Sequence, residues 1–75
     1  LAISAAAILR EAISLGAAKV LMVHNHPSGS CRASKADEQS TKELFARGLA
    51  VDIALIDHLV VGGGDIYSIR RGRIL

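Results

Sequence analysis

The run from Lys19 to Val23 leads directly into a pair of histidines, and this junction constrains the fold more than any other feature. The run reads Lys-Val-Leu-Met-Val, which has the length and composition of a buried strand. Side chains two residues apart on a strand point to the same face of a sheet. If the strand continues through His26, then His24 and His26 lie side by side at its carboxyl end.

A carboxylate follows at a spacing that returns it to the same place. After a loop containing one proline and one glycine, Ser34 has the residue type and position of a helix N-cap. Asp37 then falls in the first turn of the helix, where the helix dipole favours a negative charge. Catalytic zinc sites use three protein ligands and leave a fourth position for water. We therefore predict that His24, His26 and Asp37 bind Zn²⁺.

The periodicity of the rest of the chain predicts an α/β fold. The predicted elements are a helix from Ser4 to Leu15, a strand from Lys19 to Val23, a helix from Lys35 to about Arg47, and strands at Val51–Ile56, His58–Val61 and Ile66–Ile69. Strand, helix and strand in this order imply two parallel strands, and the turn at 62–65 makes a hairpin of the last two. The prediction is a mixed sheet with flanking helices in the order α-β-α-β-β-β. Sites in such sheets gather at the carboxyl ends of the strands.

The two predicted helices differ in polarity. The side of the first helix predicted to be buried consists of Ala7, Ile8, Ala12 and Leu15. The helix should end at Gly16. The second helix has a polar middle, so we expect an outer helix that is anchored mainly by Leu44 and Phe45 and ends at Gly48.

The segment from His24 to Gly29, followed by Ser34 and Asp37, resembles the signature of the JAMM (MPN+) metalloproteins. In that signature a His-x-His-Pro stretch is followed by a serine and, after two more residues, an aspartate. The chain is most similar to the bacterial RadC family within this group. The similarity also includes 10–12, 16–18 and 57–62, so it covers nearly all 75 residues.

The resemblance implies a JAMM/MPN-like (cytidine-deaminase-like) fold and a zinc site with His24, His26 and Asp37 as ligands. It implies that the Ser34 hydroxyl hydrogen-bonds the zinc-bound water or the developing oxyanion. The implied activity is hydrolysis of a peptide or isopeptide bond in a protein substrate through a zinc-activated water. The alternative function is a factor associated with DNA repair or recombination, whose metal site is structural or vestigial.

The chain departs from the family pattern in two places. Ser30-Cys31-Arg32-Ala33 stands where RadC proteins usually carry Asp-Pro-x-Pro, which predicts a looser loop with no ligand lost. JAMM enzymes also use a glutamate on an earlier strand as general base, and Glu11 lies in a predicted helix instead. We therefore interpret residues 1–75, which begin without a methionine, as the metal-binding half of a RadC-like domain that is inactive alone.

Two other side chains have the chemistry of metal ligands. Cys31 lies in the predicted loop and could close the site as a fourth ligand; lone cysteines are more often inert, so we favour the three-ligand site and keep Cys31 as the alternative. His58 follows Asp57 at the start of a predicted strand, a pattern more typical of a structural residue. The letters H-N-H at 24–26 are contiguous, unlike the scattered residues of the nuclease motif of that name.

The net charge is +2, and Arg70, Arg71 and Arg73 crowd the last six residues. Such a cluster can contact nucleic acid. No aromatic residues alternate with these arginines for base stacking. We favour a solvated edge that protects an exposed strand, with DNA association as the alternative.

The composition bounds the partners and the compartment. Hydrophobic residues make up 51% of the chain, with one Phe, one Tyr and no Trp, which is generous for a domain of this size. We therefore expect a homo-oligomer formed through a strand edge or the first helix, and not through the polar second helix. No apolar run reaches the length of a membrane span, and a single cysteine fits a reducing, cytoplasmic location.

Overall fold

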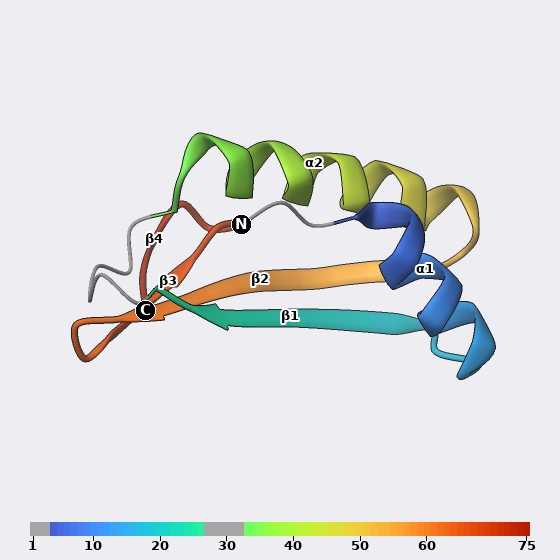
Figure 1. Cartoon of the computed structure of the whole chain (residues 1–75), viewed down its shortest axis with the longest axis horizontal. Coiled ribbons are helices and arrows are strands. Elements are labelled where there is room, and N and C mark those ends of the chain that lie inside the picture. The colour runs from blue at the N-terminus through green and yellow to red at the C-terminus, as the bar shows by residue number, and fades with distance from the viewer. Residues whose placement is uncertain (1–3, 27–32) are drawn as a thin grey trace.

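The computed structural model describes residues 4–26 and 33–75 and confirms the mixed α/β architecture (Figure 1). The elements are α1 (Ala5–Ser14), β1 (Lys19–Asn25), α2 (Lys35–Ala50), β2 (Ala54–Gly62), β3 (Asp65–Ser68) and β4 (Arg73–Ile74). In the described part of the chain the strands form one sheet in the order β1-β2-β3-β4. The pair β1–β2 is parallel, and the pairs β2–β3 and β3–β4 are antiparallel.

The two strands predicted at Val51–Ile56 and His58–Val61 are wrong as separate elements. They form one strand, β2, which begins at Ala54, because residues 51 and 52 belong to a turn. β2 contains one extra residue: Val20 pairs with Leu55, but Leu21 pairs with Asp57, so Ile56 is a β-bulge. The bulge and the adjacent polar residues interrupt the apolar pattern that would otherwise indicate one strand.

The hairpin after β2 is confirmed, with a two-residue turn. Gly63 and Gly64 both have positive φ, 58° and 81°, as the favoured two-residue hairpin turns require. The return strand lies at Asp65–Ser68, one residue earlier than predicted. The two-residue strand β4 was not predicted because it lies in a run rich in arginine.

The Asp57 carboxylate and the Arg70 side chain hold the bulged region in place. Asp57 Oδ1 accepts hydrogen bonds from the backbone N–H of His58 at 2.7 Å and of Arg70 at 3.1 Å, and Oδ2 accepts from the Ser68 hydroxyl. Arg70 Nη1 donates to the carbonyls of residues 55 and 56, both at 3.1 Å. Its guanidinium also lies 5.3 Å from the centre of the Phe45 ring. Arg70 therefore has a structural role within the predicted basic cluster.

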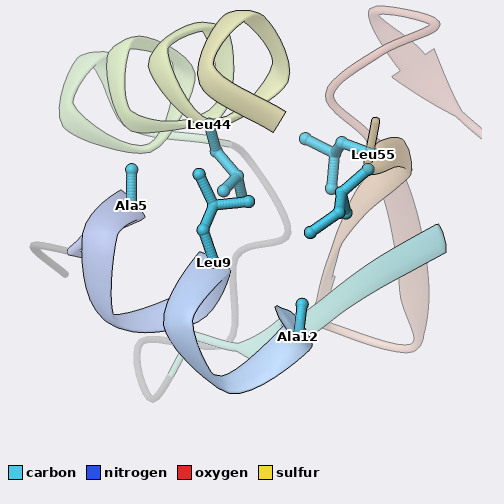
Figure 2. Close-up of a cluster of buried hydrophobic side chains, with 6 residues drawn as sticks. Ala5, Leu9, Ala12, Leu44 and Leu55 are labelled. Atoms are coloured by element: carbon cyan, nitrogen blue, oxygen red, sulfur yellow. The ribbon is translucent and has the colours of Figure 1, made fainter. Parts of the chain in front are cut away.

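The core lies between the two helices and one face of the sheet. Figure 2 shows side chains of α1, α2 and β2 pointing toward one another. The buried cluster consists of Ala5, Leu9, Ala12, Leu44, Ile53 and Leu55. The predicted buried side of α1 was partly wrong, because Leu9 is buried, whereas Ala7 is exposed and Leu15 is 73% exposed. Leu15 is the C-cap residue, so it lies past the helical face that packs on the core.

α2 continues past Gly48 to Ala50, so the predicted stop was wrong. Gly48 is buried where the chain returns toward β2, and its carbonyl accepts a hydrogen bond from the Ile53 N–H at 2.8 Å. A Cβ at position 48 would lie 2.5 Å from the Ile53 carbonyl oxygen. Glycine is therefore needed here for close packing. Of the two predicted anchors, Leu44 is 2% exposed, whereas Phe45 is 36% exposed.

Several apolar side chains on the strands remain exposed. Leu21 and Val23 of β1 are 53% and 58% exposed, and Ile66 of β3 is 41% exposed. Exposed apolar groups of this kind mark interaction surfaces when they are contiguous. The homo-oligomer expected from the sequence stays a prediction. Within 4–26 and 33–75, neither helix combines the length and the hydropathy needed to cross a bilayer.

Gly48→Ala should destabilise the chain. An alanine in a helix normally gains about 1 kcal/mol over glycine, but here the new methyl group must displace backbone atoms of Ile53. Because overpacking costs about 1–3 kcal/mol, we expect a net loss of stability in urea denaturation. The exposed substitution Gln39→Ala on the same helix should change stability by no more than about 0.5 kcal/mol. A Gly48→Ala variant as stable as the wild type would contradict the close approach.

Asp57 should make stability depend on pH in the acidic range. Burial raises the pKa of its carboxyl, but the hydrogen bonds from Ser68, Arg70 and His58 outweigh burial and hold the pKa below its usual value. A group with a lowered folded-state pKa stabilises the fold above its unfolded pKa of about 3.9 and loses this contribution as pH falls through the folded value. Asp57→Asn should cost about 2 kcal/mol at pH 7, and less at pH 3.

Urea denaturation of both proteins at the two pH values measures this change. The control is the same substitution at an exposed position of the β2–β3 hairpin, Asp65→Asn. If Asp57→Asn lowered the free energy of unfolding by the same amount at pH 3 and pH 7, the charge of Asp57 would not contribute to stability.

Candidate metal centre

The structure brings His24, His26 and Asp37 together at the carboxyl end of β1. Each offers one ligand atom, and these atoms lie within 4.8 Å of one another. His24 lies on β1, which extends two residues beyond its predicted end. His26 follows the strand, and its N–H donates to the carbonyl of Val61 at 3.0 Å, so it continues the pairing with β2. The two imidazoles are partly exposed, whereas the Asp37 side chain is fully buried.

The carboxylate of Asp37 is held by the start of α2. Ser34 is the N-cap as predicted, and its Oγ accepts a hydrogen bond from the Asp37 N–H at 3.0 Å. In return, Asp37 Oδ2 accepts from the Ser34 N–H at 3.0 Å, which completes a capping box. Burial acts to raise the pKa of the Asp37 carboxyl, but Ser34, His24 and His26 lower it below its usual value. The group is therefore a carboxylate at neutral pH.

Two buried atoms of this cluster have no hydrogen-bond partner in the part of the chain that the structure describes. They are His24 Nε2 and Asp37 Oδ1, and they lie 3.7 Å apart. The other imidazole approaches the same carboxylate, with His26 Nε2 3.2 Å from Asp37 Oδ2. Ligand atoms of tetrahedral zinc lie about 3.4 Å apart for bond lengths near 2.1 Å. The two distances, each to a different oxygen of Asp37, lie on either side of this value, and the one ligand atom that each residue offers lies within 4.8 Å of the others. Two imidazoles and a carboxylate at these separations are a donor set that fits a metal ion.

His58 lies beside the candidate ligands, a contact that was not predicted, although the expectation that it is not itself a ligand agrees with the cluster. This residue is fully buried, and its Nε2 lies 2.6 Å from Nδ1 of His24. Its other ring nitrogen, Nδ1, lies 2.7 Å from the Thr41 hydroxyl. Burial is the largest cause of a lowered pKa for both His24 and His58, so both rings are neutral at pH 7. His58 is therefore a neighbour of the metal cluster and not a member of it.

The bulge in β2 determines which side His58 faces. Leu55 packs in the core beneath the helices, and strict alternation from Leu55 would turn residue 57 to that side. The extra residue, Ile56, shifts the alternation so that His58 faces the helices and meets Thr41. Thr41 lies one helical turn after Asp37, so the sequence places it near the site, but nothing in the spacing indicates its contact with His58. The bulge itself could not be located from the pattern.

The other residues considered in the sequence analysis do not belong to the candidate ligand group of the described structure. Cys31 lies in the segment outside the described residues, so the fourth-ligand alternative stays open. Glu11 is exposed on α1 and does not belong to the metal cluster. Ser34 is exposed at the edge of the site, where its hydroxyl caps α2.

The fold and the cluster define an α/β domain with a three-residue candidate metal centre at the carboxyl end of a parallel strand. A family model described as "RadC-like JAB domain" matches residues 1–74. The chain belongs to this family.

The chain is also similar to curated relatives, all described as UPF0758 proteins. The relative from Haemophilus ducreyi is 41% identical over 66 residues, which cover 88% of this chain and 30% of the relative. The relative from Thermosynechococcus vestitus is 41% identical over 64 residues, covering 85% and 26%. One from Burkholderia mallei is 49% identical over 61 residues, covering 81% and 22%. The chain thus spans less than a third of the length of these relatives.

A divalent transition-metal ion should stabilise the chain against heat. An ion that binds only the folded state, at a free concentration 100 times its Kd, raises the free energy of unfolding by about 2.7 kcal/mol. This corresponds to a Tm increase of roughly 10–20 °C for a domain of this size. His26→Ala should abolish most of this increase, whereas Asn25→Ala, an exposed neighbour, should retain it. Differential scanning calorimetry with and without metal measures the effect. An equal increase in His26→Ala would exclude His26 as a ligand.

Proposed function

We propose that the chain is the metal-binding part of a zinc-dependent metallohydrolase that acts on peptide or isopeptide bonds. The observation that supports this proposal is a pair of buried atoms, His24 Nε2 and Asp37 Oδ1, that find no hydrogen-bond partner among residues 4–26 and 33–75 and lie beside His26 Nε2. Buried polar atoms in native proteins are nearly always paired. A cation between these atoms would satisfy both.

The donor set favours zinc. Two neutral imidazole nitrogens and one carboxylate oxygen are the ligands of several catalytic zinc sites. The lowered pKa of His24 keeps its ring neutral, and the lowered pKa of Asp37 keeps its carboxylate charged. Both ligands are therefore in their metal-binding protonation states at neutral pH. Three protein ligands leave a position open for water or substrate.

Each component has a defined chemical task in this proposal. When bound, zinc lowers the pKa of a water molecule to about 7 and polarises a carbonyl group. His24 and His26 supply neutral ligand nitrogens, and Asp37 supplies the negative charge. The Ser34 hydroxyl accepts from the Asp37 N–H, so its own hydrogen can be donated to an oxyanion at the edge of the site.

Proton transfer to the leaving amine requires a further group. The metal cluster of the described residues contains no second carboxylate to act as base. General acid–base catalysis contributes roughly 10²–10⁴-fold to rate. We therefore propose that this group belongs to the longer protein, as the resemblance implies, and that residues 1–75 alone hydrolyse peptide bonds very slowly.

Zinc binding and hydrolysis should be measured separately. Elemental analysis of the purified chain should find about one zinc per protomer; His26→Ala should lose most of it and Cys31→Ala should not. Zinc retained by a His24→Ala, His26→Ala double variant would contradict the ligand assignment.

A longer protein that carries this chain is the appropriate material for activity. It should cleave peptide substrates in a zinc-dependent manner that Asp37→Asn abolishes. DNA binding that weakens steeply with salt, without zinc-dependent cleavage, would instead support the alternative DNA-associated role.

A further inference from the structure

We propose that His58 is a positioning residue, which accepts a hydrogen bond from Nδ1–H of His24 and thereby directs the lone pair of His24 Nε2 toward Asp37. The inference rests on the proposed zinc site. Its direct evidence is the 2.6 Å separation of His24 Nδ1 and His58 Nε2. Exactly one hydrogen can occupy so short a contact, so the two rings must have complementary protonation.

Thr41 determines which ring provides that hydrogen. Its hydroxyl lies 2.7 Å from the backbone carbonyl of Asp37, and a carbonyl can only accept. The Thr41 hydroxyl therefore donates to Asp37, and its oxygen accepts from the ring nitrogen of His58 at 2.7 Å. His58 then carries its hydrogen on Nδ1, so its Nε2 is the acceptor for His24.

Three hydrogen bonds therefore connect the backbone of Asp37 to the imidazole of His24. They run from the backbone carbonyl of Asp37 through Thr41 and His58 to Nδ1–H of His24. The free lone pair of His24 is consequently on Nε2, which lies 3.7 Å from Asp37 Oδ1. The first two turns of α2 thus supply one candidate ligand directly and set the tautomer of another.

A purely structural role does not explain this arrangement. His58 and Thr41 are both buried at the junction of α2 and the sheet, where apolar side chains would pack without needing polar partners. A metal-bound histidine, in contrast, requires its second ring nitrogen to be held, usually by a carboxylate or a carbonyl. Here a neutral imidazole takes that place, so the holding group adds no second negative charge to that of Asp37.

The tautomers can be measured in the metal-free chain. Long-range ¹⁵N–¹H correlation spectra should show both His24 and His58 protonated at Nδ1 and unprotonated at Nε2. Thr41→Val removes the acceptor that holds His58, so the Nδ1–H tautomer of His24 should no longer dominate. Thr41→Ser retains a hydroxyl and should preserve the wild-type pattern. A wild-type His24 protonated at Nε2 would overturn the inference, whether or not zinc binds.

Zinc affinity provides the second readout. In competition titrations with a chromophoric chelator, His58→Leu and Thr41→Val should weaken zinc binding by about 10–100-fold, as substitutions of such outer-shell partners do. His58→Gln should restore part of the affinity, because its amide oxygen can accept from His24. Wild-type affinity in a folded His58→Leu or Thr41→Val variant would overturn the proposal.

The two proposals fail differently. If the wild-type chain binds zinc and His58→Leu binds it equally well, the positioning role is wrong and the metal site stands. If the wild-type chain binds zinc with the expected dependence on His58 but the longer protein hydrolyses nothing, the proposed function is wrong and the positioning role stands. Melting temperatures of the metal-free variants identify any variant that fails to fold. If the variants do not fold, the tautomers of His24 and His58 in the wild-type chain decide whether the positioning role is correct.

Discussion

Parallel pairing of β1 with β2 is the constraint on which the rest of the structure depends. Two consecutive strands can be parallel only if the connecting segment returns the chain to the starting end of the sheet. α2 provides that return, so its first turn must lie near the carboxyl end of β1 (Figure 1). The histidines at the end of β1 and Asp37 at the start of α2 are therefore brought together by the connection itself. The capping box with Ser34 then fixes the orientation of the carboxylate.

The bulge in β2 adds a second level of organisation to this arrangement. The extra residue changes which side chains of β2 face the helices, and it turns His58 toward His24 and Thr41. The backbone N–H of Arg70 donates to Asp57, and the Arg70 side chain donates to the carbonyls of residues 55 and 56, so these bonds connect the bulge to the segment that follows β3. Arg70, one of the arginines near the carboxyl end of the chain, therefore helps to maintain the geometry behind the candidate metal centre.

Local signals in the sequence were sufficient to predict most of this fold. Ser34 and Asp37 formed the predicted helix start, and the alternation from β1 placed His24 on the correct face. The predictions failed where tertiary contacts override local pattern. Gly48 suggested a helix end but serves a close approach to Ile53, and two apparent strands are joined through a bulge at Ile56. The contact of His58 with His24 depends on that bulge, so it could not be predicted from spacing.

The central claim is that three protein ligands hold the metal and leave a position open. X-ray absorption spectroscopy of the zinc-loaded chain tests it most directly. We predict a first shell made only of nitrogen and oxygen at about 2.0–2.1 Å, with the multiple-scattering features of two imidazoles. A sulfur scatterer at about 2.3 Å would show that Cys31 closes the site as a fourth protein ligand, and would contradict the account of an open, hydrolytic centre.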